Sequence, residues 1–144
     1  MHRFLPLLFL TAACASGSGA AALEVDGGWV RTFPTDRDRA YHAALAVLGE
    51  EGYTIERANP LGGSITAQSP VQSAFVPLYG RMLRYTRARV DLDAGLDEGT
   101  RVRLVLVRTH EPAGAGRRPN NDRTVTERAP YEALLDKIGR AILR

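Results

Sequence analysis

Few side chains in this sequence have the types and the spacing that catalysis requires. The most suggestive acidic pair is Asp91 and Asp93, which stand two positions apart where polar and apolar residues alternate. Two carboxylates on one strand face can act as general acid and general base. However, Arg101 and Arg103 follow in the next alternating segment. Opposite charges at these positions predict a charge ladder across two paired strands instead of a catalytic pair.

The histidines do not form a recognisable site either. His42 falls beside the apolar stripe of a predicted helix, and we expect it to be a partly exposed structural residue. His110 ends a predicted strand next to Glu111, and neighbours in a strand point to opposite faces. A metal site needs three or four converging ligands, and the sequence contains no CxxC, HxH or HExxH spacing. We therefore predict no metal and no cofactor.

Motifs for nucleophilic catalysis and phosphate binding are also missing. The sequence has neither GxSxG nor SxxK, which would place a serine nucleophile beside its base. The segment GAGRRPNN, residues 114–121, has glycines and arginines that could cradle a phosphate. It lacks the strand-to-helix setting and the final Lys-Ser/Thr of a P-loop, so we interpret it as a polar loop. These absences predict that the protein is not an enzyme.

The residue with the most specific surroundings is Cys14, the single cysteine. It is preceded by a short basic start, His2 and Arg3, and by the apolar run FLPLLFL at residues 4–10. That run is too short to cross a bilayer, which takes about 20 residues. Small residues follow it, and this three-part layout is typical of a secretory signal peptide. We predict a signal peptide over residues 1–13.

The residues LTAAC, 10–14, resemble the lipobox of bacterial lipoproteins, with Thr11 where leucine is usual. The resemblance implies that the Cys14 thiol receives a diacylglycerol and that cleavage leaves Cys14 as the acylated first residue. Ala15 in place of aspartate implies release to the outer membrane, facing the periplasm. Acyl chains contribute about 0.8 kcal/mol per buried methylene and would anchor the protein to the membrane. Residues 14–23 are then the lipidated cysteine and a flexible tether, and residues 24–144 form the folded domain.

The charge of the chain argues against nucleic acid as a partner. The formal net charge is +3, from 19 Lys+Arg against 16 Asp+Glu, and Lys137 is the only lysine. A protein that binds nucleic acid gathers its basic residues on one element. Here acidic residues are interleaved with the basic ones, which predicts only weak attraction to anionic surfaces.

Periodicity predicts a single small α+β domain. A strand over residues 28–34 precedes a helix capped by Thr35, and Gly52 is placed to end that helix. Residues 53–67 read as a hairpin, residues 84–108 as a second and longer one, and Pro130 opens a final amphipathic helix. The predicted order is β-α-β-β-β-β-α, an antiparallel sheet with both helices packed on one face. In the long hairpin we predict that Asp93 pairs with Arg101 and Asp91 with Arg103, which also aligns the apolar faces.

Residues 70–83, PVQSAFVPLYGRML, are apolar but have no regular period and are interrupted by Pro70, Pro77 and Gly80. They form either a loop folded over the core or an exposed apolar flap. An exposed apolar patch edged with charge often marks a contact surface. The candidate residues for partner contact are those of the flap and of the arginines after it: Phe75, Leu78, Tyr79, Arg84, Arg87 and Arg89.

The run from Phe33 to Ala67 has a helix after an acidic cap, then Gly-Tyr-x-Ile, then Gly-x-Ile-x-Ala. This pattern resembles a unit of BamC-type accessory lipoproteins of the outer-membrane assembly machinery and of uncharacterised lipoproteins. The resemblance implies a fold much more than a function. The main hypothesis is a non-catalytic binding or accessory module of the envelope, with a function in outer-membrane assembly or integrity and an envelope protein as partner. The alternative is a periplasmic carrier of a small molecule or lipid, with a cavity between helices and sheet.

Overall fold

The computed structural model describes residues 22–95, 97–114 and 121–144. Cys14 and the predicted signal peptide therefore lie outside the described residues, as does most of the loop at 114–121. The elements, in chain order, are β1 (Leu23–Val25), β2 (Gly28–Phe33), α1 (Arg37–Glu50), β3 (Thr54–Asn59), β4 (Ser64–Gln68), β5 (Gln72–Val76), β6 (Gly80–Ala94), β7 (Thr100–Pro112), β8 (Asp122–Thr124) and α2 (Arg128–Ile142).

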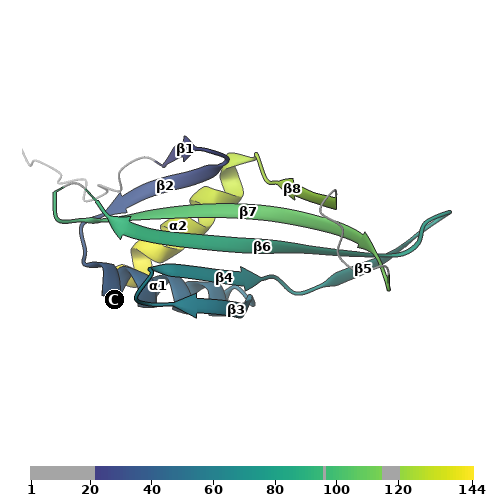
Figure 1. Ribbon diagram of the computed structural model, residues 1–144, viewed down its shortest axis with the longest axis horizontal. Helices are drawn as coiled ribbons and strands as arrows, with labels where there is room; N and C mark the ends of the chain where they lie inside the picture. The colour runs from purple at the N-terminus through teal and green to yellow at the C-terminus, as the bar shows by residue number, and fades with distance from the viewer. Residues whose placement is uncertain (1–21, 96, 115–120) are drawn as a thin grey trace, which may run out of the picture.

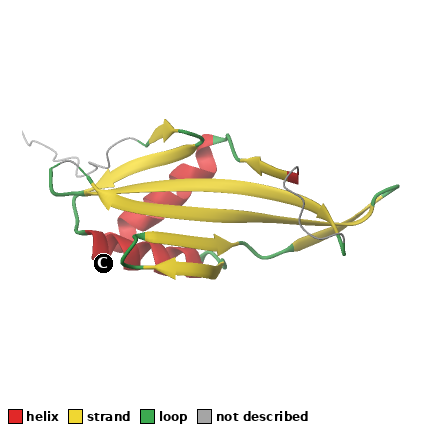
Figure 2. Ribbon diagram, in the orientation of Figure 1, coloured by secondary structure: helices red, strands yellow, loops and turns green. Residues whose placement is uncertain are grey.

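In the described part of the chain, eight strands form one sheet in which every pairing is antiparallel. The main path runs β1-β2-β7-β6-β4-β3, while β5 pairs with β6 and β8 pairs with β7. Both helices lie on one side of this sheet (Figures 1 and 2). The α+β class and the two-layer arrangement are thus confirmed. The structure adds three short strands, β1, β5 and β8, to the predicted order, and β1 begins one residue before the predicted domain start at 24.

The register of the long hairpin is the predicted one. The Cα partners include Asp91 with Arg103 and Asp93 with Arg101. The side chains follow this register only in part, because Arg101 lies 3.4 Å from Asp93 while Asp91 lies 3.0 Å from Arg89 on its own strand. Both carboxylates form ion pairs with arginines, Asp93 across the strands as the predicted charge ladder requires and Asp91 within β6.

The core lies between the two helices and the middle of the sheet. Strands β6 and β7 turn alternate residues toward it, and Val90 and Leu104 are cross-strand partners that are fully buried. The second helix contributes the amphipathic stripe that the sequence predicts. Its buried residues are Tyr131, Leu134, Leu135, Ile138 and Ile142.

The start of the first helix differs from the prediction. Asp36, and not Thr35, is the N-cap, and its carboxylate accepts a hydrogen bond from the Arg39 backbone nitrogen at 2.8 Å. The carbonyl of Thr35 instead accepts a hydrogen bond from the Thr100 hydroxyl at 2.8 Å. Thr35 and Asp36 are both residue types that cap helices, and here the Asp36 carboxylate does so. Gly52 follows the helix at φ +80°, as predicted.

The two central strands are longer than the helices that cover them. Figure 1 shows β6 and β7 continuing past α1 and α2, with β5 folded back along the far part of β6. We call residues 72–84, which comprise β5, the turn after it and the start of β6, the arm. The arm contains most of the segment 70–83 and points away from the core. For this segment the sequence left two alternatives, a loop over the core or an exposed flap.

Candidate functional site

The apolar residues of the arm are exposed, which resolves the two alternatives for this segment in favour of a flap. Leu78 is fully exposed at 102%, and Phe75 and Tyr79 expose 78% and 72% of their surface. All three predicted apolar contact residues therefore lie together at or near the tip. Every residue of β5 is exposed as well. Apolar side chains gathered in this way are unusual on a monomer and mark contact surfaces.

Leu78 carries a second unusual feature. Its φ is +73°, in the left-handed region, which costs an L-residue with a Cβ roughly 1 kcal/mol or more. Glycine or asparagine would fit this position better. Leu78 thus combines a strained backbone with a fully exposed apolar side chain, and neither feature contributes to folding. Such a combination makes Leu78 a candidate contact residue.

The predicted arginines do not join these apolar residues. Arg87 lies 3.4 Å from Glu56 and 6.0 Å from the centroid of the Tyr85 ring. Arg89 lies 3.0 Å from Asp91. Both are engaged by side chains of their own sheet, and both lie on β6 beyond the residues that pair with β5. The sequence grouped them with the arm only because they are close along the chain.

Arg81 is the arginine that accompanies the apolar residues. It is the cross-strand partner of Phe75, so the two side chains share a face, and it donates a hydrogen bond to the Ser73 hydroxyl at 3.2 Å. Arg84 points to the other face, because side chains alternate along a strand. The candidate contact surface of the arm therefore consists of Phe75, Leu78, Tyr79 and Arg81.

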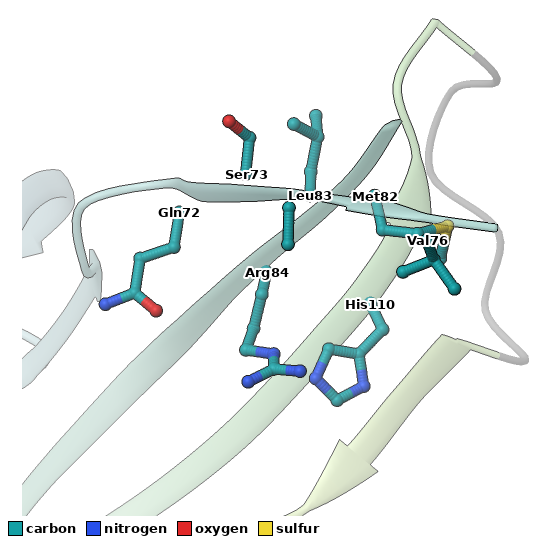
Figure 3. Close-up of a pocket in the computed structure, with 8 residues that line it drawn as sticks. Gln72, Ser73, Val76, Met82, Leu83, Arg84 and His110 are labelled. Carbon is teal, nitrogen blue, oxygen red and sulfur yellow. The ribbon is translucent and has the colours of Figure 1, made fainter. Parts of the chain in front are cut away.

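The other face of the arm holds a pocket of about 340 Å³. Figure 3 shows the side chains of Gln72, Arg84 and His110 on one side of the strands, with the Arg84 guanidinium beside the His110 ring. Ser73 and Leu83 point the opposite way. Val76 and Met82 add apolar surface to the pocket. The sequence suggested for His110 only the functions of metal ligand and catalytic base, and it supported neither. It did not place His110 in a pocket, because Arg84 and His110 are brought together by the β6–β7 register.

Burial lowers the pKa of His110, and the positive charges of Arg84, Arg108 and Arg123 lower it further. Its Nε2 atom is buried and has no hydrogen-bond partner among the described residues. His42, in contrast, has a side chain that is 68% exposed and lies 3.5 Å from Asp38 on the same helix. His42 is the exposed helix residue that the sequence predicts.

Two further features are absent from the residues that the structure describes. They contain no group of three or more His, Cys, Asp or Glu side chains placed to hold a metal ion. They also contain no helix that is long and apolar enough to span a membrane.

The space between helices and sheet is filled by side chains. Ile65, Val90, Leu104 and Leu135 are each 0% exposed and pack in one cluster. A carrier that binds its ligand between the helices and the sheet would need an open cavity there. The closed core weighs against the carrier alternative.

The sequence matches no protein-family model and no curated protein. Among solved structures, it is similar to a TBP-like protein from Parabacteroides distasonis ATCC 8503, with 12% identity, a TM-score of 0.40 and coverage of 85% of this chain and 97% of that one. A DUF4468 family protein from Bacteroides ovatus ATCC 8483 shows 16% identity, a TM-score of 0.40 and coverage of 85% and 91%. Similarities this distant do not carry a function over, which must come from the residues of this chain.

Proposed function

We propose that this protein is a lipid-anchored, non-catalytic binding module of the bacterial envelope, held at the outer membrane and facing the periplasm. The lipobox residues LTAAC around Cys14 support the anchor. The arm supports the binding role, and its partner is an envelope protein of the outer-membrane assembly or integrity systems. A tether between the anchor and the domain would leave the arm free to reach that partner.

The observation that carries the binding role is Leu78, fully exposed and at φ +73°. A turn residue that served only to connect β5 to β6 would not need an apolar side chain. Phe75 and Tyr79 extend the apolar surface, and aromatic residues are enriched in the contact regions of protein interfaces. Arg81 adds a cation next to Phe75, and arginine is enriched at interface hot spots.

The anchor is tested by replacing the acceptor thiol. We expect the full chain to fractionate with membranes and to carry acyl mass on Cys14, and the Cys14→Ser variant to lose both. Membrane fractionation that persists in Cys14→Ser would contradict the lipid anchor while leaving the arm untested by that result.

The binding role is tested separately by crosslinking in cells. A photoreactive amino acid replaces Tyr79 on the arm, and in a control it replaces Leu61, which is 88% exposed at the turn between β3 and β4. We expect the same envelope protein to be captured repeatedly from position 79 and not from position 61. Introducing Leu78→Asn should reduce that capture about tenfold or more without lowering the stability of the fold. Equal capture from both positions, or capture unaffected by Leu78→Asn, would contradict the role of the arm.

A further inference from the structure

A second cluster of positive charge lies on the face of the sheet that points away from the contact surface of the arm. Arg84 on β6 is the Cα partner of His110 on β7, and Arg108 on β7 is the partner of Arg123 on β8. Directly paired residues of antiparallel strands project to the same face. His110 and Arg108 are two residues apart on one strand, so all four side chains share that face.

The charges of this cluster are not neutralised within the described part of the chain. Glu127, 3.9 Å from Arg108, is the acid that meets the cluster. No ion pair or hydrogen bond within the described residues engages the side chain of Arg84 or Arg123. The acids nearest in sequence face the other way, because Glu111 neighbours His110 and Asp122 is the cross-strand partner of Thr109. Three guanidinium groups against one carboxylate leave a net charge of about +2 here, with His110 neutral.

Two pockets meet at His110. The pocket of about 340 Å³ places Arg84 beside Val76 and Met82. A second, of about 330 Å³, is lined by Arg108, Arg123 and the residues from Thr124 to Glu127 that lead into α2. His110 lines both of them. The cluster therefore lines two concave pockets that share His110, with Arg84 in the first and Arg108 and Arg123 in the second, and one wall of the first is apolar.

We propose that the cluster of Arg84, Arg108, His110 and Arg123 binds a phosphate group. Guanidinium groups match the geometry of phosphate oxygens through paired N–H donors, and several of them can share one phosphate. The buried Nε2 of His110, which lacks a partner among the described residues, becomes an additional donor when the imidazole is protonated. The apolar wall at Val76 and Met82 would contact an acyl chain if the phosphate belongs to a lipid. This site does not depend on the lipid anchor or on the partner of the arm.

The test uses the purified full chain in an uncharged detergent, with binding measured by calorimetry at low ionic strength. The probes are glycerophosphoglycerol, a free phosphodiester, and dihexanoylphosphatidylglycerol below its micelle concentration, which bears the same head group on two short acyl chains. A phosphodiester keeps its charge in the range where a histidine titrates, so a change of affinity with pH reports on the protein. Tighter binding of the lipid probe would assign the site to a lipid head group, and equal binding would assign it to a free phosphate ester.

We expect Arg84→Gln and Arg123→Gln each to weaken binding about tenfold, equivalent to ~1.4 kcal/mol. The matched control is Arg101→Gln, because Arg101 is exposed on the opposite face of β7 and should leave binding unchanged. Affinity should rise as the pH falls, since a bound phosphate offsets the arginine charges that lower the pKa of His110, and His110→Asn should remove this rise. Failure of both probes to bind, or binding that Arg84→Gln and Arg101→Gln change equally, would overturn the site.

Discussion

Tyr131 connects the second helix to the sheet at the scale of a single residue. Its side chain is fully buried, and its hydroxyl donates to the Val125 carbonyl at 2.7 Å while it accepts from the Leu106 amide at 3.2 Å. Val125 in turn donates its amide to the Leu106 carbonyl at 2.8 Å. The Trp29 ring packs at 5.9 Å from the ring of Tyr131. One phenol therefore holds β7, the segment before α2, and α2 itself in one arrangement.

Replacing this phenol by phenylalanine keeps the ring and removes both hydrogen bonds. Tyr131→Phe leaves a buried carbonyl and a buried amide without this partner, and we expect the free energy of unfolding to fall by ~1–3 kcal/mol. Urea denaturation measures the change, and Tyr79→Phe on the exposed arm is the control, with an expected change below ~0.5 kcal/mol. Equal stabilities of the two variants would show that the Tyr131 hydroxyl contributes nothing.

The same substitution should also alter the dependence of stability on pH. Burial raises the pKa of Tyr131 in the folded protein above its value of about 10 in the unfolded chain. The stability that depends on a neutral Tyr131 is therefore complete below pH ~10 and is lost as the pH rises further. Because phenylalanine cannot ionise, the gap between the wild type and Tyr131→Phe should narrow above pH ~10. A constant gap would contradict the raised pKa.

At the scale of elements, the turn between β3 and β4 is fixed by Gly63. Its φ is +63°, and a Cβ at this position would lie 2.5 Å from the Leu92 carbonyl oxygen. The Leu92 amide donates to the Gly63 carbonyl at 2.7 Å, so the backbones of the turn and of β6 are in direct contact. This explains physically the glycine of the Gly-x-Ile-x-Ala pattern, since only glycine fits both the conformation and the approach.

Gly63→Ala and Gly80→Ala form a matched pair that separates the cost of the left-handed conformation from the cost of the close approach to β6. Gly80 has φ +73°, and a Cβ added there would meet no other atom within 4 Å. Alanine at position 80 therefore costs only the left-handed conformation, ~1–2 kcal/mol. Gly63→Ala adds the displacement of the β6 backbone and should be more destabilising by at least ~1 kcal/mol. Denaturation of both variants measures the difference, and a smaller effect of Gly63→Ala than of Gly80→Ala would contradict the close approach.

Helix α2 and the β6–β7 hairpin could be predicted from the sequence because each buries one face, whereas β5 could not. The stripe of α2 and the register of β6 with β7 rest on the burial of residues such as Leu135 and Val90, which imposes a period on the sequence. Strand β5 has five exposed residues, and its sequence therefore carries no alternation. It is a strand because it pairs with the free edge of β6 at residues 80–84, and the sequence of β5 alone does not show that this edge is available.

At the scale of the whole molecule, the sequence predicted which segment forms the candidate site but not which charged side chains lie beside it. The apolar character of residues 70–83 identified the arm, whereas its arginines were assigned by closeness in sequence. In the structure, Arg84 and Arg87 lie in different places. Arg84 faces the pocket because side chains alternate along β6, and Arg87 forms an ion pair with Glu56. His110 and Arg123 come together only because β7 and β8 pair across a connection. Such a cluster leaves no local signal in the sequence.

The division of the molecule into a covered body and an uncovered arm leads to a prediction about local stability. In the body, Ala88, Val90 and Leu104 are fully buried beneath the helices, so their strands open only with the whole fold. In the arm, β5 pairs with β6 but all of its side chains are exposed, so little apolar burial opposes its detachment. We therefore expect the amides of residues 72–76 to exchange with deuterium at least about a hundredfold faster than those of residues 88–92. Exchange measured by mass spectrometry tests this, and protection of both segments to the same degree would show that the arm folds and unfolds together with the body. A partner bound at Phe75 and Leu78 should slow exchange in β5 selectively, because it would supply the burial that the isolated chain does not provide.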